Sequence, residues 1–179
     1  EPGFNYLREH PAEDGSSMWE VGAGAGTGKI VNRALTRGLS GPEVLAGVPG
    51  TMGGALIMNA GGHEGEIKSI VNRVLIAHEG EVKWLSREEA GFEYRRSNFP
   101  MGSYILGCEL SLSPGNKESL KAQVKEHQRR RRETQPLRFP NAGSIFKNPP
   151  GDYAGRLIEE AGCKGMQVGQ AQVSELHAN

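Results

Sequence analysis

Glycine is the feature that most restricts how this chain can fold. The 179 residues include 26 glycines, and many of them fall in two stretches, residues 21–29 (VGAGAGTGK) and residues 47–62 (GVPGTMGGALIMNAGG). Clustered glycines permit tight turns and close approaches between backbone segments. They also leave backbone N–H groups uncovered, and such groups can bind a pyrophosphate without side-chain charge. The pattern is typical of a ligand site built from loops, although tight packing of a loop on a sheet would use glycine in the same way.

The first glycine stretch is similar to a phosphate-binding loop, but its spacing fits neither common pattern. A nucleoside-triphosphate loop needs a glycine where the chain has Ala23, and a serine or threonine where it has Ile30. The dinucleotide pattern lacks its third glycine. We therefore predict a glycine-rich turn that leads into a helix, whose backbone amides could still contact a phosphate.

Hydrophobic periodicity predicts the first elements of the chain. Residues 1–17 are polar and patternless and are expected to form a loop, followed by a short strand that ends in glycines. A helix is predicted to begin with Thr27 as its N-cap and to stop at Gly38. Its apolar residues share one helical face: Ile30, Val31, Ala34 and Leu35.

A helix-poor region follows this helix. The segment Pro42–Glu66 is expected to form buried loop and short helix, because its glycines separate short apolar runs. Residues 69–86 predict a hairpin with its turn at Glu79-Gly80. Residues 103–114 alternate strictly and predict a strand. The residues expected on one face of this strand are Leu106, Cys108, Leu110 and Leu112.

A break at residues 114–116 (PGN) separates this part from a charged, helical remainder. A surface helix is predicted after the break, with Leu120 and Val124 on a narrow apolar stripe. A second short helix is predicted with Asp152 as its cap, Gly162 at its end, and the inward residues Leu157, Ile158 and Ala161, before a return to strand. The fold class expected is α+β, with one domain over residues 1–113 and the start of a second over residues 114–179.

Composition argues against several classes of partner. Lys+Arg and Asp+Glu both number 21, so the formal net charge of zero gives no general attraction to nucleic acid or to an anionic membrane. The run of four arginines at residues 129–132 lies at a predicted helix end, where cations suit the helix dipole. No apolar run reaches the ~18 residues of a membrane span. We expect neither a nucleic-acid partner nor a membrane segment.

The cysteines and histidines do not form a recognisable ligand set. Cys108 and Cys163 make neither a disulfide framework nor a metal spacing, and fit a reducing compartment. The five histidines are scattered, so we predict no metal site. The chain begins at Glu1 without an initiator methionine and ends at Asn179 in what reads as the middle of an element, so we expect a fragment.

Two polar residues stand out as candidate chemical groups. Arg95 lies in EYRRSNF, where neighbouring aromatics can hold a guanidinium rigidly toward an anion, although a solvated surface arginine has the same sequence. Ser144 lies in NAGSIFKNP, which is not the GxSxG turn of a hydrolase and has no histidine nearby to act as a base. A serine hydroxyl in this setting can still donate a proton to an anionic intermediate.

Four blocks, in this order, resemble one family. They are GLSGPEVLAGVPGTMGGALIMNAGG, FEYRRSNF, RRETQPLRFPNAGSIFKNP and AGRLIEEAG. Together they resemble the UDP-N-acetylenolpyruvoylglucosamine reductases, flavoenzymes of bacterial cell-wall precursor synthesis, from about Val21 to Asn179. The resemblance implies part of an FAD-binding domain of the vanillyl-alcohol oxidase (PCMH) type, followed by part of a C-terminal substrate domain. It also implies a cytoplasmic enzyme, of unknown oligomeric state.

The resemblance also implies a chemistry. NADPH reduces the bound FAD, and the reduced flavin then reduces the enolpyruvyl double bond of a UDP-linked amino sugar to give UDP-N-acetylmuramate. Ser144 matches the family serine that protonates the resulting enol, and Arg95 matches the arginine that stabilises its negative charge. Residues that match substrate contacts are Tyr94, Gln135, Lys147 and Asn148. Residues that match the flavin-binding loop are Val48, Pro49, Gly50, Thr51, Gly53, Gly54, Asn59 and Gly61.

The chain departs from the family in several places. The family's N-terminal glycine-rich flavin loop is absent, and its catalytic glutamate would lie beyond Asn179, so we expect this chain alone to be inactive. Gly62-His63-Glu64 and Pro42 replace residues that are usual in the family. A related FAD-dependent oxidase and a non-enzymatic module that binds through its basic helix remain as alternative interpretations.

Overall fold

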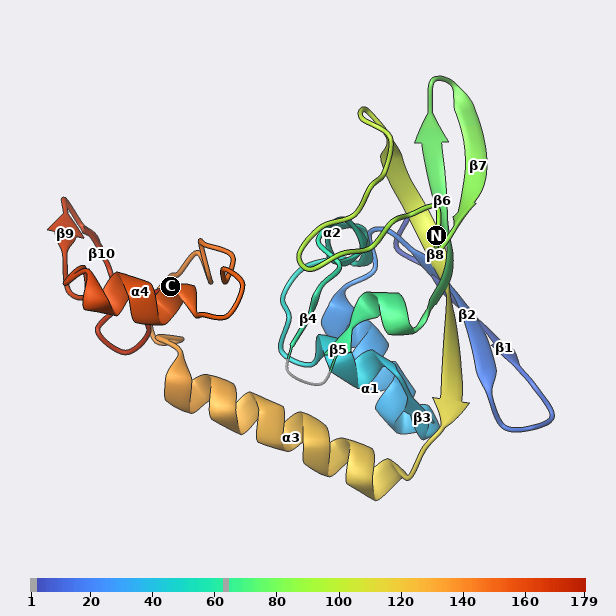
Figure 1. Cartoon of the computed structure of the whole chain (residues 1–179). Helices are drawn as coiled ribbons and strands as arrows, with labels where there is room; N and C mark the ends of the chain where they lie inside the picture. Colours follow the sequence, from blue (N-terminus) through green and yellow to red (C-terminus); the bar gives the residue numbers. More distant parts are fainter. Residues whose placement is uncertain (1–2, 63–64) are drawn as a thin grey trace. The chain divides into compact units, whose positions relative to one another are not determined.

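The computed structural model describes residues 3–62 and 65–179. Most of the run Gly62-His63-Glu64, where the sequence departs from the family, lies outside the described residues. The chain divides into two compact units, Glu1–His127 and Gln128–Asn179, which are described separately (Figure 1). Helix α3 (Lys117–Thr134) begins in the first unit and ends in the second. The domain boundary expected after Ser113 stays a prediction.

An antiparallel sheet forms the frame of the first unit. Within the described residues it has six strands, in the order β1-β2-β8-β6-β7, with β3 paired to the end of β8 (Figure 1). The hairpin predicted at Glu79-Gly80 and the long strand predicted at residues 103–114 are confirmed. The strands are β1 (Leu7–Pro11), β2 (Ser17–Gly22), β3 (Leu39–Ser40), β6 (Val71–His78), β7 (Glu81–Ser86) and β8 (Tyr104–Pro114). Helices and an antiparallel sheet together confirm the α+β class.

The expectation of a loop over residues 1–17 is wrong, because strand β1 lies in that segment. It pairs with β2 from Leu7↔Val21 to Pro11↔Ser17. An edge strand has only one neighbour and little buried surface, so it needs no apolar alternation in its sequence. The pairing partner in space creates this strand, and periodicity therefore misses it.

Helix α1 (Thr27–Arg37) follows β2 and packs its predicted apolar face inward. Ile30, Val31 and Ala34 are buried, and Gly38 ends the helix in a left-handed conformation, as predicted. The N-cap is Gly26 rather than Thr27. The predicted cap is wrong because Thr27 already has helical conformation, and the preceding residue, Gly26, is the extended one.

The segment after α1 contains short helices and one tight strand pair, in agreement with the expected buried loop and short helix. These elements are the 3₁₀ turns η1 (Pro42–Leu45) and η2 (Ile67–Ser69), helix α2 (Met52–Ile57), and strands β4 (Gly61–Gly62) and β5 (Gly65–Glu66). The sequence did not predict the β4–β5 pair, in which Gly61 lies opposite Glu66.

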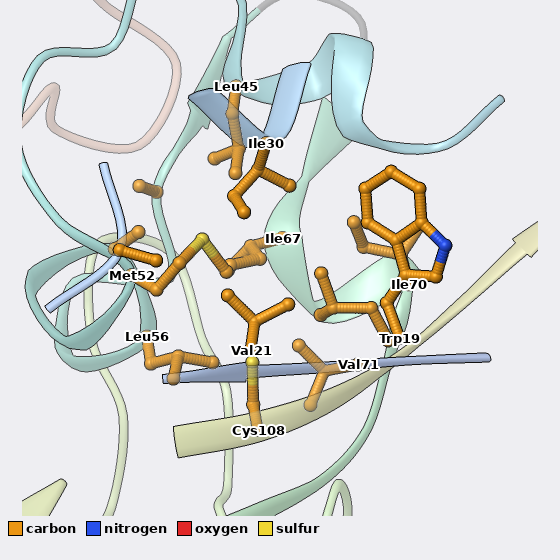
Figure 2. Close-up of a cluster of buried hydrophobic side chains, with 14 of the residues drawn as sticks. Trp19, Val21, Ile30, Leu45, Met52, Leu56, Ile67, Ile70, Val71 and Cys108 are labelled. Atoms are coloured by element: carbon orange, nitrogen blue, oxygen red, sulfur yellow. The ribbon is translucent and has the colours of Figure 1, made fainter. Parts of the chain in front are cut away.

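The core of the first unit lies between the helices and one face of the sheet. Figure 2 shows side chains from α1, α2, η1 and η2 meeting side chains from β2, β6 and β8. The large apolar side chains with no measurable exposure are Trp19, Val21, Ile30, Leu45, Met52, Leu56, Ile67, Val74, Ile76 and Leu110. Burial of each such side chain is worth about 1.5–3 kcal/mol, so this cluster holds α1 and α2 against the sheet.

The other face of the sheet carries a buried charge. Glu109 of β8 is only 5% exposed. Its carboxylate accepts a hydrogen bond at 2.7 Å from Nε of Arg73, on the neighbouring strand β6, and a second from Nη2 of the same guanidinium. The Arg73 guanidinium lies 4.3 Å from the centre of the Trp84 ring on β7. The paired arginine thus compensates a carboxylate that would otherwise be costly to bury.

The second unit contains the end of α3, helix α4 (Ala154–Glu160) and a small hairpin of β9 (Gln167–Val168) and β10 (Ala171–Gln172). Leu120 and Val124 lie in the part of α3 that belongs to the first unit, and both are buried, as predicted. The predicted cap of the second helix is wrong, because its N-cap is Tyr153 rather than Asp152. Leu157 is 39% exposed, and the predicted inward position of this residue is therefore wrong as well. Ala161 is also exposed, whereas Ile158 is half-buried.

Candidate functional site

The two glycine stretches of the sequence meet in the first unit. Gly26 and Thr51 form an antiparallel bridge. The Thr27 N–H donates to the Gly50 carbonyl at 3.1 Å, and the Met52 N–H donates to the Ala25 carbonyl at 2.9 Å. These reciprocal bonds place the first residues of α1 and α2 side by side. Two helix N-termini therefore concentrate positive dipole ends at one position.

The side chain of Thr27 strengthens this junction. Thr27 is 1% exposed. Its hydroxyl oxygen lies 2.6 Å from the Val48 carbonyl oxygen and 3.2 Å from the Gly50 carbonyl oxygen. The hydroxyl donates its hydrogen bond to the nearer oxygen, that of Val48. This bond holds the second glycine stretch against the start of α1.

The glycines of the predicted flavin loop serve two different purposes. A Cβ atom on Gly53 would lie 3.2 Å from the Cβ of Ala23, and one on Gly61 would lie 2.0 Å from the Gly65 carbonyl oxygen. These two positions are glycine because backbone segments touch there. A Cβ on Gly50 or Gly54 would meet nothing within 4 Å. Those two positions leave an open surface.

The open glycine surface fits a flat or bulky anionic ligand. Gly28, in the first turn of α1, likewise has no neighbour within 4 Å of a Cβ position. Uncovered glycines next to two helix N-termini allow a phosphate to approach backbone N–H groups closely. The described residues therefore fit the diphosphate part of a dinucleotide such as FAD, with the open glycines and Thr51 as its floor.

Asn59, another predicted loop residue, uses its whole side chain inside the protein. It is fully buried and has a positive φ of 42°. Its Nδ2 donates to Glu66 Oε2 at 2.8 Å and to the Glu93 carbonyl at 2.9 Å, and its Oδ1 accepts from the Lys68 N–H at 3.2 Å. Asn59 thereby connects the loop to two later segments.

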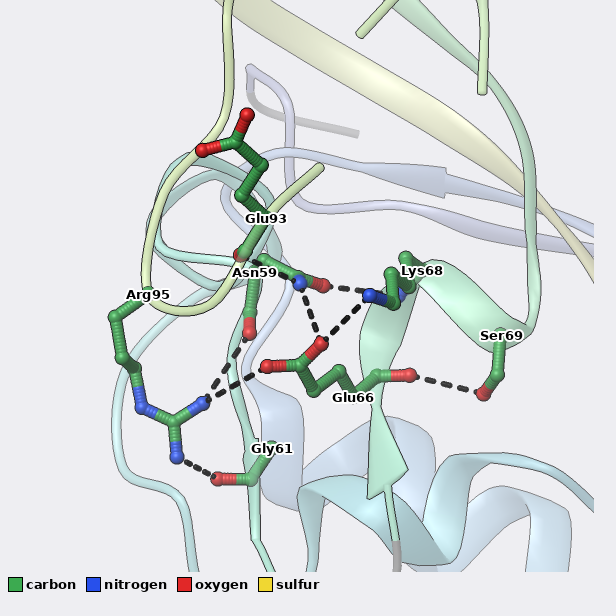
Figure 3. Close-up of polar contacts among 7 residues, drawn as sticks. All are labelled: Asn59, Gly61, Glu66, Lys68, Ser69, Glu93 and Arg95. Carbon is green, nitrogen blue, oxygen red and sulfur yellow. Dashed lines mark hydrogen bonds and ion pairs between the residues drawn. The ribbon is translucent and has the colours of Figure 1, made fainter. Parts of the chain in front are cut away.

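Arg95 is fastened to the same loop (Figure 3). Its Nη2 donates to the Gly61 carbonyl at 2.8 Å, and its Nη1 donates to the Asn59 carbonyl at 3.4 Å. Its guanidinium carbon lies 5.1 Å from the centre of the Tyr94 ring, a cation–π contact. The solvated-surface alternative for Arg95 does not describe this geometry, since the side chain has three ordered partners.

Glu66 is a site residue that the sequence did not reveal. Figure 3 shows its carboxylate between the side chains of Asn59, Lys68 and Arg95. Oε2 lies 3.1 Å from Lys68 Nζ, and Oε1 lies 3.7 Å from Arg95 Nη1. Glu66 thus joins the loop amide to the candidate catalytic arginine. No spacing rule marks it, because Asn59 and Arg95 lie 7 and 29 positions away in the sequence.

The remaining predicted residues belong to the second unit. Ser144 and Lys147 are exposed. Asn148 Oδ1 accepts from the Ala154 N–H at 3.0 Å, and Gln135 Oε1 accepts from Arg131 Nε at 2.8 Å. Ser144 and Asn148 therefore share a segment that is tied to the start of α4. Their relation to Arg95, in the first unit, stays a prediction.

No group of three or more His, Cys, Asp or Glu side chains within residues 3–62 and 65–179 is arranged to hold a metal ion. None of the helices in that part of the chain has the length and apolar content that crossing a membrane requires.

Comparison with family models gives two matches. Residues 7–86 match the model of the FAD binding domain. Residues 135–179 match the model of the UDP-N-acetylenolpyruvoylglucosamine reductase C-terminal domain. The predicted order, a flavin-binding part followed by a substrate part, is confirmed by these two matches. The glycine junction and Asn59 all lie within the first matched range.

Individual relatives agree with the family models. The chain is 47% identical over 94% of its length to UDP-N-acetylenolpyruvoylglucosamine reductase 2 of Symbiobacterium thermophilum, and 45% identical over 89% to the reductase of Myxococcus xanthus. It covers 55% and 51% of those two proteins. The chain thus spans about half the length of the curated relatives it matches.

A solved structure supports the same assignment. The crystal structure of UDP-N-acetylenolpyruvylglucosamine reductase from Thermus caldophilus matches 89% of this chain, with a TM-score of 0.81 and 40% sequence identity. This chain covers 59% of that protein. Sequence blocks, family models and structural similarity agree, and all three relate this chain to the UDP-N-acetylenolpyruvoylglucosamine reductases.

Proposed function

We propose that this chain forms part of an FAD-dependent, NADPH-dependent reductase of the cytoplasm. Its substrate would be UDP-N-acetylglucosamine enolpyruvate, and its product UDP-N-acetylmuramate, a precursor of peptidoglycan. When bound, the flavin supplies the hydride for the enolpyruvyl double bond. The protein's own residues bind and orient the reactants and transfer the proton.

The attachment of Arg95 to the flavin loop is the observation that carries this proposal. Reduction of an enolpyruvyl group places negative charge on the oxygens next to the reacting carbon, so a cation must lie beside the flavin. The bonds from Arg95 to the carbonyls of Asn59 and Gly61 fix a guanidinium to the loop that fits the cofactor. A preorganised donor of this kind contributes ~3 kcal/mol to transition-state stabilisation.

The other predicted residues have supporting roles in the proposal. Ser144 donates a proton from its hydroxyl to the enol, which is the step that completes reduction. Tyr94 holds Arg95 through its ring. Gln135, Lys147 and Asn148 contact the nucleotide end of the substrate, where a lysine suits phosphate charge.

Two half-reactions measured separately test the proposal. The complete reductase that contains this chain, loaded with FAD, is reduced anaerobically by NADPH and then mixed with the enolpyruvyl substrate, and the return of oxidised-flavin absorbance is followed. Ser144→Ala should leave reduction by NADPH unchanged and slow reoxidation by ~10²-fold or more, as expected on loss of a general acid. Arg95→Met should slow the same step by ~10²–10³-fold.

Two further measurements complete the test: a control for Arg95→Met, and a comparison with the oxidase alternative. Arg96→Met removes a neighbouring guanidinium whose side chain is 62% exposed and should leave both half-reactions unchanged. Rapid reoxidation by oxygen without reoxidation by the enolpyruvyl compound would overturn the reductase proposal.

A further inference from the structure

The segment that carries Ser144 buries little apolar surface. The side chains of Ile145 and Phe146, which follow the serine directly, are 71% and 61% exposed. Apolar burial therefore contributes little to the conformation of this segment. Its position in the second unit depends on hydrogen bonds.

One side chain supplies most of these hydrogen bonds. Asn179 Oδ1 accepts from the backbone N–H of Ile145 at 3.0 Å and from that of Phe146 at 2.8 Å. Asn179 Nδ2 donates to the Phe146 carbonyl at 2.9 Å. A single rigid amide plane thus fixes three successive peptide units after Ser144, with one contact to each.

The backbone before Ser144 is fixed as well. Asn141 Oδ1 accepts from the Gly143 N–H at 3.1 Å. Gly143 has a φ of +70°, which glycine adopts without a steric penalty. With both neighbouring peptides defined, the direction of the Ser144 Cα–Cβ bond depends on the contacts of Asn141 and Asn179.

Asn179 is itself held against helix α4. The Nδ1 of His177 lies 2.8 Å from the backbone oxygen of Asn179. A Cβ on Gly155 would lie 3.8 Å from both the Asn179 Cβ and the His177 Cε1, so these two side chains pack over a glycine of α4. Together with the bond from the Ala154 N–H to Asn148, this anchors the serine segment to α4 at two points.

We propose that Asn179 is a positioning residue that holds Ser144 in the orientation from which its hydroxyl donates a proton. This inference rests on the proposed function. Proton transfer requires the donor oxygen within hydrogen-bond reach of its acceptor, and an error of about 1 Å in such geometry can slow a step by ~10²-fold. Asn179 acts through the backbone of Ile145 and Phe146 and does not itself contact the reacting atoms.

The first test measures amide hydrogen exchange in this chain without flavin. Asn179→Leu has nearly the same shape and makes none of the three bonds, so the Ile145 and Phe146 amides should exchange at least ~10-fold faster. Asn179→Asp still accepts from both amides but cannot donate to the Phe146 carbonyl, and its exchange rates should fall between the two. Gln167→Leu is the matched control, because Gln167 Nε2 donates to the Gly169 carbonyl at 2.9 Å, within the β9–β10 turn.

The second test measures the proton-donating step in the complete, FAD-loaded reductase that contains this chain. Asn179→Leu should slow reoxidation by the enolpyruvyl substrate by ~10–100-fold and leave reduction by NADPH unchanged. Adding Asn179→Leu to Ser144→Ala should slow the step no further, because two changes that act through one group are not additive.

The outcomes separate this inference from the proposed function. Unchanged exchange of the two amides in Asn179→Leu would overturn the inference. Faster exchange together with additive kinetic effects would reduce Asn179 to a purely structural residue and overturn it too. If the substrate does not reoxidise the wild-type flavin while the amides respond as expected, the proposed function fails, and the positioning role fails with it. The hydrogen bonds from Asn179 to the backbone of Ile145 and Phe146 would then be structural only.

Discussion

The hydroxyl of Thr27 donates a hydrogen bond to the carbonyl oxygen of Val48 at 2.6 Å, across 21 positions of sequence. This bond joins the first turn of α1 to the second glycine stretch. Thr27 is already the first helical residue, after the N-cap Gly26, so its hydroxyl serves this contact between segments rather than a cap. The floor of the candidate flavin site depends on this contact.

Replacing Thr27 by valine tests the junction. Valine has the same shape but no hydroxyl, so the Val48 carbonyl loses a donor in a buried position. We expect the free energy of unfolding to fall by ~1–3 kcal/mol, measured by urea denaturation. Thr27→Ser keeps the hydroxyl and should retain most of the stability, and an equal loss in both variants would contradict the role of the bond.

The carboxylate of Glu66 is expected to stabilise the site as well as to orient Arg95. Glu66→Ala removes an acceptor from Asn59 and an anion from between Lys68 and Arg95. The free energy of unfolding should fall by ~1–3 kcal/mol. Glu81→Ala, at an exposed position of β7, should change it by less than ~0.5 kcal/mol.

The pair of Arg73 and Glu109 gives a prediction about buried charge. Arg73→Leu leaves the Glu109 carboxylate, 5% exposed, without its guanidinium. A fully buried pair would lose ~3–5 kcal/mol, and because the Arg73 side chain is 46% exposed we expect a smaller loss of ~2 kcal/mol. Adding Glu109→Leu should recover part of this loss in denaturation experiments. A double variant no more stable than Arg73→Leu would contradict the explanation.

Asp152 gives a prediction about pH. Hydrogen bonds from the Arg156 guanidinium, and then from the Tyr153 N–H, lower the pKa of this carboxyl to about 2. The folded pKa lies below the unfolded value of ~3.9. The contribution of this pair to stability is therefore fully present above pH ~3.9 and is lost as the pH falls toward 2. Arg156→Gln should raise the Asp152 pKa in an NMR titration. The pKa of Asp14, which is lowered by Ser16 instead, should not move.

The two cysteines should differ in reactivity. Cys108 is 1% exposed in the core, and burial raises the pKa of its thiol. Only a thiolate reacts readily with alkylating reagents, so Cys108 should react at the rate of unfolding. Cys163 is partly exposed and should be labelled first in the native protein, as mass spectrometry of the peptides would show. Equal labelling rates in native conditions would contradict this assignment.

Local patterns in the sequence were sufficient for elements that pack one face against the core. The alternation of β8 and the apolar face of α1 were predicted correctly because burial on one face imposes a period of its own on the sequence. Gly38 was predicted as the end of α1 because its left-handed conformation is a property of that one residue. The four family blocks carried the assignment of Ser144, Arg95 and the flavin loop.

One element that depends on a distant partner was missed, and one local contact was predicted wrongly. Strand β1 exists because β2 offers it a hydrogen-bonding edge, and its own sequence is polar. Asp152 was predicted as a helix cap, but Tyr153 takes that position while the Asp152 side chain binds Arg156. A short-range rule cannot decide between two partners of similar energy.

The sequence by itself determined the fold class, the family and the identities of the candidate chemical groups, because these are written in residue type and local spacing. Only the tertiary structure decided which atoms hold those groups in place. Thr27 with Val48, Glu66 with Arg95, and Asn179 with Phe146 are contacts between segments far apart in the chain. Packing of the core and chain reversal bring such segments within hydrogen-bond distance, and the spacing of residues along the sequence does not encode that distance.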